Sequence, residues 1–167
     1  MRRNHILVSS LIIISLLTAA NASGQKGEQN EPDMLIKATK LLEEKPFDKG
    51  AKDVRPWAIK WVIETDKVSV TVCSLLVSGI DKKYKYSSEI FGQYTLGMAP
   101  FKLANPDRAK DEDAAQLAGI TSALTSYESM AREQPKAKNA FLDDLLAKRA
   151  DGSLAKYAAE NNCKSKS

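Results

Sequence analysis

The two cysteines, Cys73 and Cys163, are the side chains of this sequence best suited to covalent chemistry. A catalytic cysteine must ionise to a thiolate, which requires a base or a cation close by. The neighbours of Cys73 are apolar, Val72 and Leu75 among them, and such surroundings disfavour the thiolate. An even number of cysteines in an exported chain is typical of disulfide bonding. The sequence therefore predicts a Cys73–Cys163 disulfide between positions 90 residues apart.

The only histidine, His5, lies in a segment that we expect to be removed. Residues 1–22 have a basic start, an apolar centre and a small-residue end, which is the pattern of a cleaved signal peptide. The apolar centre of about a dozen residues is shorter than the roughly 20 that span a membrane. We therefore expect export to the periplasm or extracellular space, with no stable membrane anchor after cleavage. A mature chain without histidine excludes catalytic triads, histidine bases and histidine metal sites.

Carboxylates are the remaining candidates for catalysis, because a glycan hydrolase can use two carboxyl groups as its acid and base. Each nominal candidate falls at the start or on the solvent-facing side of a predicted helix. These candidates are Glu89, Glu128, Asp143 and Asp144. A carboxylate-dependent glycan hydrolase is therefore kept as an alternative, while the principal expectation is that the protein is not an enzyme.

The charge pattern gives no sign of a nucleic-acid partner or a metal. The formal net charge is +4, and removal of Arg2 and Arg3 leaves 23 basic against 21 acidic residues, or about +2. The acidic residues of segment 107–113 suit the positive end of a helix dipole. Helical spacing spreads them around the axis instead of converging them, so we expect no metal and no other cofactor.

Four aromatic residues are the candidates for partner binding. Trp57 and Trp61 are four residues apart in a predicted helix and therefore face one side of it. Tyr84 and Tyr86 alternate with lysines in the predicted loop 81–88, a combination able to grip an anionic or glycan surface. The tryptophans have a second interpretation as core anchors, and the tyrosines a second interpretation as side chains folded back onto the core.

The elements that must position these residues are predicted to be helices. Gly97 and Pro100 predict a break near residue 97, and the glycines of this region favour close helix packing. Asn105 and Pro106 predict an N-cap and the first helical position of the longest helix. Apolar residues recur at spacings of three and four in the segments 34–42, 55–66, 90–101, 105–134, 141–146 and 154–158.

The stretch VSVTVCSLLVSGI, residues 68–80, fits two templates. Val68, Val70 and Val72 alternate as in a strand, but three consecutive apolar residues then end the alternation. A strand also needs a partner, and no second β-rich run is present. We therefore predict a buried helix with β-branched residues at its start. The fold class is then all-α, a compact bundle of six or seven short helices with one disulfide.

The predicted domain organisation has four parts. They are a signal peptide (1–22), a disordered leader (23–31) without apolar residues, a single helical domain (32–163) and a disordered tail (164–167). A signal peptide, a small helical domain and a two-cysteine staple are together similar to small exported immunity proteins that block type VI secretion effectors. The stretch RPWAIKWVIETDKVSVTVCSLLVSGI resembles a block of uncharacterised small exported bacterial proteins. This resemblance implies an exported helical protein and assigns no functional residue.

The principal hypothesis is an exported, non-enzymatic binding or interaction protein of the bacterial envelope, of which an immunity-type inhibitor is one form. Its partner would be another protein or an envelope component, contacted through a helix face or the Tyr84/Tyr86 loop. A structural or stress-protective envelope protein is the second alternative beside the hydrolase. The sequence does not specify the oligomeric state.

Overall fold

The structure, a computed structural model, describes residues 31–163. The predicted signal peptide, the leader up to residue 30 and the tail 164–167 lie outside this range. Glu31, predicted to belong to the leader, is instead the first residue of a helix. The α-helices of the described range are α1 (Glu31–Glu44), α2 (Ala51–Glu64), α3 (Ser87–Ala104), α4 (Glu112–Glu133), α5 (Ala140–Asp151) and α6 (Leu154–Glu160). The 3₁₀ turns are η1 (Ser74–Val77), η2 (Pro106–Arg108) and η3 (Pro135–Ala137).

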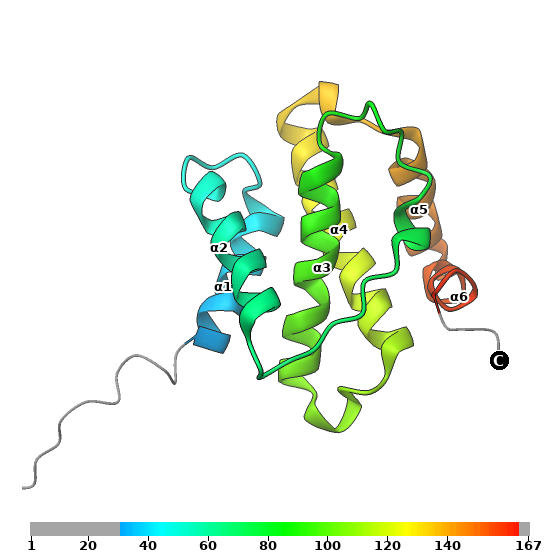
Figure 1. Ribbon diagram of the computed structural model, residues 1–167. Helices are drawn as coiled ribbons and strands as arrows, with labels where there is room; N and C mark the ends of the chain where they lie inside the picture. Colours follow the sequence, from blue (N-terminus) through cyan, green and yellow to red (C-terminus); the bar gives the residue numbers. More distant parts are fainter. Residues whose placement is uncertain (1–30, 164–167) are drawn as a thin grey trace, which may run out of the picture.

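The predicted all-α bundle is confirmed, because residues 31–163 form six α-helices and no strand. Figure 1 shows α3 and α4 side by side at the centre, with α1 and α2 on one side and α5 and α6 on the other. One core cluster lies between the α1–α2 pair and α3, around Leu35, Leu42 and Trp61. The other joins α3 and α4 to α5 and α6, around Tyr94 and Tyr127. The α1–α2 pair is therefore a separate layer on the central helices.

Two glycines bring the backbones of α3 and α4 together. A Cβ at Gly97 would lie 2.4 Å from the Cβ of Ser122, and one at Gly119 would lie 2.6 Å from the carbonyl oxygen of Tyr94. Neither position has room for a side chain, which confirms close packing as the role of Gly97. The predicted break near this residue is wrong, since α3 runs unbroken through Pro100. Packing against α4 holds α3 together where the proline removes one backbone hydrogen bond.

Local capping chemistry fixes three of the helix ends, namely the start of α4 and both ends of α5. Asp111 accepts a hydrogen bond from the backbone N–H of Ala114 (3.0 Å), and Asn139 accepts one from Leu142 (3.1 Å). Gly152 ends α5 with a φ of 83°, a conformation that favours glycine. The prediction of one long helix from Asn105 is therefore wrong. Pro106 begins only the turn η2, and α4 starts after the Asp111 cap.

Helix α2 also starts earlier than the sequence predicted. It begins at Ala51, so Pro56 lies within the helix and not in its first turn. The Arg55 guanidinium donates to the carbonyl of Pro46 (3.1 Å) and ties the first turns of α2 to the beginning of the α1–α2 connection. The tryptophans remain on this helix as predicted.

The predicted buried helix over residues 68–80 is wrong. Residues 68–73 have no helical structure, and only the single turn η1 follows them. Side chains of α3 and α4 replace the helical hydrogen bonds. Lys102 Nζ donates to the Ser69 carbonyl (2.9 Å), and Gln116 Nε2 donates to the Thr71 carbonyl (2.6 Å). The Tyr94 hydroxyl bridges the N–H and the carbonyl of Cys73, at 3.2 Å each.

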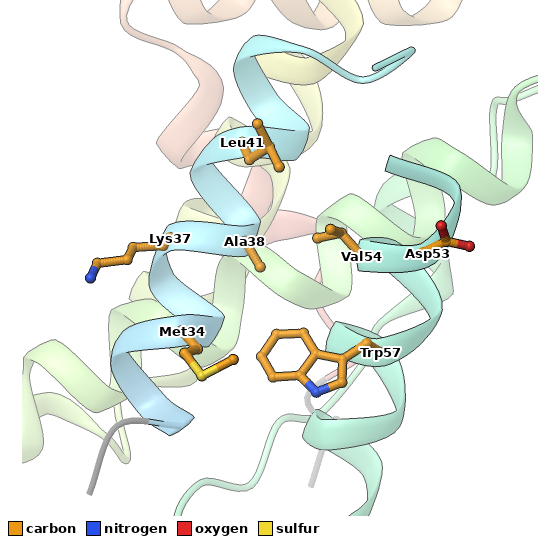
Figure 2. Close-up of a pocket in the computed structure, with 7 residues that line it drawn as sticks. All are labelled: Met34, Lys37, Ala38, Leu41, Asp53, Val54 and Trp57. Atoms are coloured by element: carbon orange, nitrogen blue, oxygen red, sulfur yellow. The ribbon is translucent and has the colours of Figure 1, made fainter. Parts of the chain in front are cut away.

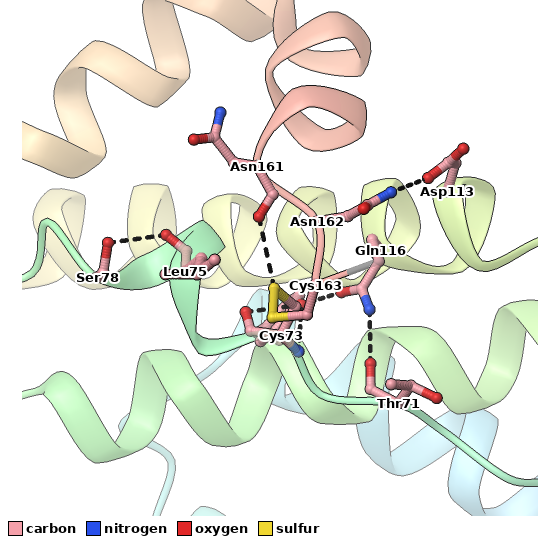
Figure 3. The surroundings of a disulfide bond; sticks show 10 residues. Thr71, Cys73, Leu75, Ser78, Asp113, Gln116, Asn161, Asn162 and Cys163 are labelled. Carbon is pink, nitrogen blue, oxygen red and sulfur yellow. Dashed lines mark hydrogen bonds between the residues drawn. A yellow bond between two sulfur atoms is a disulfide. The ribbon is translucent and has the colours of Figure 1, made fainter. Parts of the chain in front are cut away.

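The predicted disulfide is confirmed. Cys73 precedes η1 and Cys163 follows α6, with their Cα atoms 5.3 Å apart (Figure 3). Cys73 is fully buried, whereas Cys163 is exposed. The Asn162 side chain donates to Asp113 on α4 next to the bond. The disulfide therefore fastens the end of α6 to the extended segment that crosses the central helices.

Candidate interaction surface

An apolar groove of about 490 Å³ runs between α1 and α2. Figure 2 shows the apolar side chains of the two helices converging on it, with the Trp57 ring on one wall and Met34 facing it. Lys37 and Asp53 lie at opposite edges of the groove. The lining residues are Met34, Lys37, Ala38, Leu41, Asp53, Val54 and Trp57. We call this surface the α1–α2 groove.

The groove exists because α1 carries a wider apolar stripe than its core contacts use. Leu35 and Leu42 are fully buried against the central helices. Met34 and Leu41, at neighbouring angles on the helix, face α2 instead, and 46% of the surface of Met34 is exposed. The volume of this groove falls within the range of pockets that bind ligands, which makes it a candidate interaction site.

The two tryptophans have different environments, although they share a helix face. Trp61 is buried, with 8% of its surface exposed, and its indole N–H donates to a carboxylate oxygen of Glu31 (2.9 Å). Trp57, one turn earlier, is half-buried and lines the α1–α2 groove. Trp61 therefore joins α2 to the start of α1. Trp57 instead presents an aromatic face to any ligand that enters the groove.

The two tyrosines fold back onto the protein. The Tyr84 hydroxyl donates to the carbonyl of Ala137 (2.6 Å), and the Tyr86 hydroxyl donates to Gln134 Oε1 (2.8 Å). Tyr86 is buried and Tyr84 half-buried, and burial raises the pKa of Tyr84. Neither lines the α1–α2 groove, so the four aromatic residues do not form one site.

The four carboxylates considered for hydrolysis each have a local partner. Glu128 pairs with Arg149 (2.6 Å), and Asp144 pairs with Lys148 (3.5 Å). None of them lines the α1–α2 groove. The other two accept hydroxyl hydrogen bonds: Asp143 from Tyr127 (2.6 Å) and Glu89 from Ser88 (2.8 Å).

The acidic segment 107–113 serves helix ends and ion pairs. Besides capping α4, Asp111 pairs with Arg108 (2.9 Å). Glu112 pairs with Lys102 (2.6 Å), a lysine of which only 5% is exposed. Within residues 31–163, no three histidine, cysteine, aspartate or glutamate side chains are grouped so as to hold a metal ion.

Sequence reasoning missed a polar cluster between α1, α3 and α4. The Ser122 hydroxyl donates to the Glu43 carboxylate (2.5 Å) and accepts from the Gln93 amide (2.9 Å). Gln93 also donates to the carbonyl of Thr39 (3.1 Å). Burial raises the pKa of Glu43 above its ordinary value of 4.5, and the Ser122 hydrogen bond opposes that rise. No spacing signal marks this cluster, because its members lie on three separate helices.

We expect Glu43→Gln to reduce the pH dependence of stability. A raised pKa means that the folded state binds more protons than the unfolded state above pH 4.5, so stability falls as pH rises through the folded-state pKa. The variant should therefore gain stability relative to the wild type between about pH 4.5 and 7. Urea unfolding across this range measures the difference. The exposed neighbour provides the control Glu44→Gln, and an equal change in both variants would contradict the prediction.

Searches for similar proteins found no matching family model, curated protein or solved structure. None of the helices within residues 31–163 combines the length and the apolar character needed to cross a membrane.

Proposed function

We propose that this chain is an exported, non-enzymatic binding protein that holds an amphipathic helix of a partner protein in the α1–α2 groove. The observation that carries the proposal is the exposed apolar groove with the half-buried Trp57 on its wall. Helices commonly dock in such grooves through apolar residues at spacings of three and four. Tryptophan is also enriched among the residues that dominate interface energies.

The charges at the groove edges indicate the chemistry of the partner. Lys37 lies on the α1 edge and Asp53 on the α2 edge. A complementary helix has an apolar stripe with acidic residues on the side that faces α1 and basic residues on the side that faces α2. Such charges fix orientation more than they add affinity.

Export is supported by two features of different kinds. The chain has the N-terminal pattern of a signal peptide, and its two cysteines are joined in a disulfide. Disulfides persist mainly in oxidising compartments such as the periplasm and the extracellular space. An immunity-type inhibitor, whose partner is a secreted effector, is one protein class with these properties.

A library of displayed amphipathic helices provides the test. Selection on the wild-type protein should enrich peptides with apolar residues at positions i, i+3 or i+4, and i+7. Trp57→Ala should weaken binding of the enriched peptides about 30-fold, which is typical of losing an aromatic anchor at the centre of an interface. Binding is measured by titration calorimetry with purified protein.

The matched control is Ile63→Ala, on the same helix. Ile63 is the most exposed large apolar residue of the described range, at 75%, and it does not line the groove. We expect this variant to bind the peptides as the wild type does. Failure to enrich any helix, or equal loss of binding in both variants, would contradict the proposal.

A further inference from the structure

We infer that the extended segment 68–72 is an edge for β-strand pairing, and that its partner is the same segment of a second copy of this chain. Figure 1 shows residues 65–73 crossing the central helices between α2 and η1 without helical structure. Within residues 31–163 no strand pairs with it. This interface is separate from the α1–α2 groove and does not depend on the function proposed for it.

Side chains hold only one edge of this segment. The carbonyls of Ser69 and Thr71 accept hydrogen bonds from Lys102 and Gln116, as Figure 3 shows for Thr71. The Cys73 carbonyl accepts one from Tyr94. Every second carbonyl is thus fastened to α3 or α4, which is the pattern of a strand paired along its inner edge.

The other edge has no hydrogen-bond partner within residues 31–163. Successive backbone groups of an extended chain point in opposite directions, so the N–H and carbonyl groups of the three valines face away from the inner edge. Among the described residues, none forms a hydrogen bond with the backbone of Val68, Val70 or Val72. The sequence between positions 68 and 72 contains no proline and no charge, the devices that protect most exposed strand edges.

A second copy fits this edge in one antiparallel register. With Val70 on the two-fold axis, Val70 faces Val70, and Val68 faces Val72 of the other copy. All outward backbone groups are then used, because facing residues of this kind exchange both of their hydrogen bonds. The exposed Ser69 faces the exposed Thr71, a favourable cross-strand pair.

The flanking residues also tolerate this register. Lys67 faces Cys73 and Asp66 faces Ser74, so no like charges oppose each other. Val72 and Leu75, exposed by 37% and 54%, lie at the end of the paired segment and add apolar surface next to it. A symmetric contact of this kind closes as a dimer and leaves no free edge of the segment.

Amide hydrogen exchange followed by NMR tests the inference on the unmodified protein. Raising the protein concentration should slow exchange at Val68, Val70 and Val72, and leave Ser69 and Thr71 unchanged. Sedimentation should show a monomer–dimer equilibrium over the same concentrations. A monomer with unchanged exchange at about 1 mM protein would overturn the inference, even for an interface of this small size.

Two proline variants distinguish the contributions of the outward and inward edges of segment 68–72 to the dimer. Val72→Pro removes an outward N–H from each copy, so the dimer should dissociate about 30-fold more readily, from two hydrogen bonds lost. Thr71→Pro removes an inward N–H that has no hydrogen bond among the described residues, and should leave the dimer unchanged. Equal weakening by both variants, with folding confirmed by circular dichroism, would overturn the assignment of edges. Slowed exchange only with an added strand peptide would overturn the second copy as partner.

Discussion

The double variant Cys73→Ala/Cys163→Ala is expected to lose about 4–5 kcal/mol of its free energy of unfolding. The disulfide joins positions 90 residues apart, and on the chain-entropy model a loop of this length gives a stabilisation of that size. The short helix α6 lies just before Cys163, and its core contacts come from the buried Leu154 and Ala158 and the partly buried Tyr157. Without the disulfide this helix should be the first element to open.

Urea unfolding with and without a reducing agent measures this effect. Reduction should destabilise the wild type by nearly as much as the double variant is destabilised, and should leave the variant itself unchanged. Fully buried Cys73 loses some packing in the variant, so the variant should be the less stable of the two reduced chains. A loss below about 1 kcal/mol on reduction would contradict the structural role assigned to the bond.

The second large effect is expected from Gly119→Ala. The added methyl group would lie 2.6 Å from the carbonyl oxygen of Tyr94, and this atom belongs to the α3 backbone. Backbone cannot move aside as a flexible side chain can, so α3 and α4 must separate. We expect a net cost of about 1–3 kcal/mol, as for other overpacked cores.

Gly92→Ala is the matched control on α3. A Cβ there would lie 3.8 Å from the nearest atom, Cδ1 of Ile59, which is an ordinary contact. Alanine is the better helix former by up to about 1 kcal/mol, so this variant should be as stable as the wild type or more stable. Thermal unfolding compares the two variants. Equal melting temperatures would contradict the close approach of α3 and α4.

The helices could be predicted because apolar spacing is a local signal. The disulfide could be predicted because the chain has only two cysteines. Apolar spacing predicts a helix at the place of each of the six α-helices, and on α5 it also identifies the buried Leu142 and Leu145. Two cysteines leave only one intramolecular pairing. The predictions from proline were wrong twice near the C-terminal end of α3, since Pro100 is held within a packed helix and Pro106 starts only a turn. Tertiary contacts, and not proline alone, determine where the helices end and begin at these positions.

The segment 68–80 could not be predicted because long-range side chains fix it. Lys102 and Gln116 supply hydrogen bonds from two different helices. No residue pattern in the valine-rich stretch predicts these bonds. The valine alternation agrees with the non-helical backbone of residues 68–73, although the described residues form no strand with it. The chain itself satisfies one edge with side chains, a solution that sequence periodicity does not reveal.

The candidate site was only half visible in the sequence. Trp57 and Trp61 share a helix face, and only the fold shows that Trp61 is buried beside Glu31 while Trp57 borders a groove. The other wall comes from α1, where Met34 belongs to the apolar spacing of segment 34–42 but lines the groove. Which part of an apolar stripe stays uncovered depends on the neighbouring helix, so helical spacing alone cannot locate the groove.

Photo-crosslinking in the cell that naturally produces the protein tests the groove most directly. A photoreactive amino acid placed at Lys37, on the edge of the α1–α2 groove, should form a crosslink to one partner protein, within a helix that has an apolar stripe. The same group placed at Lys156 on α6, where the lysine side chain is 77% exposed, should not trap that partner. Crosslinks at Lys37 that are absent, or that match those from Lys156, would contradict the groove as the binding site.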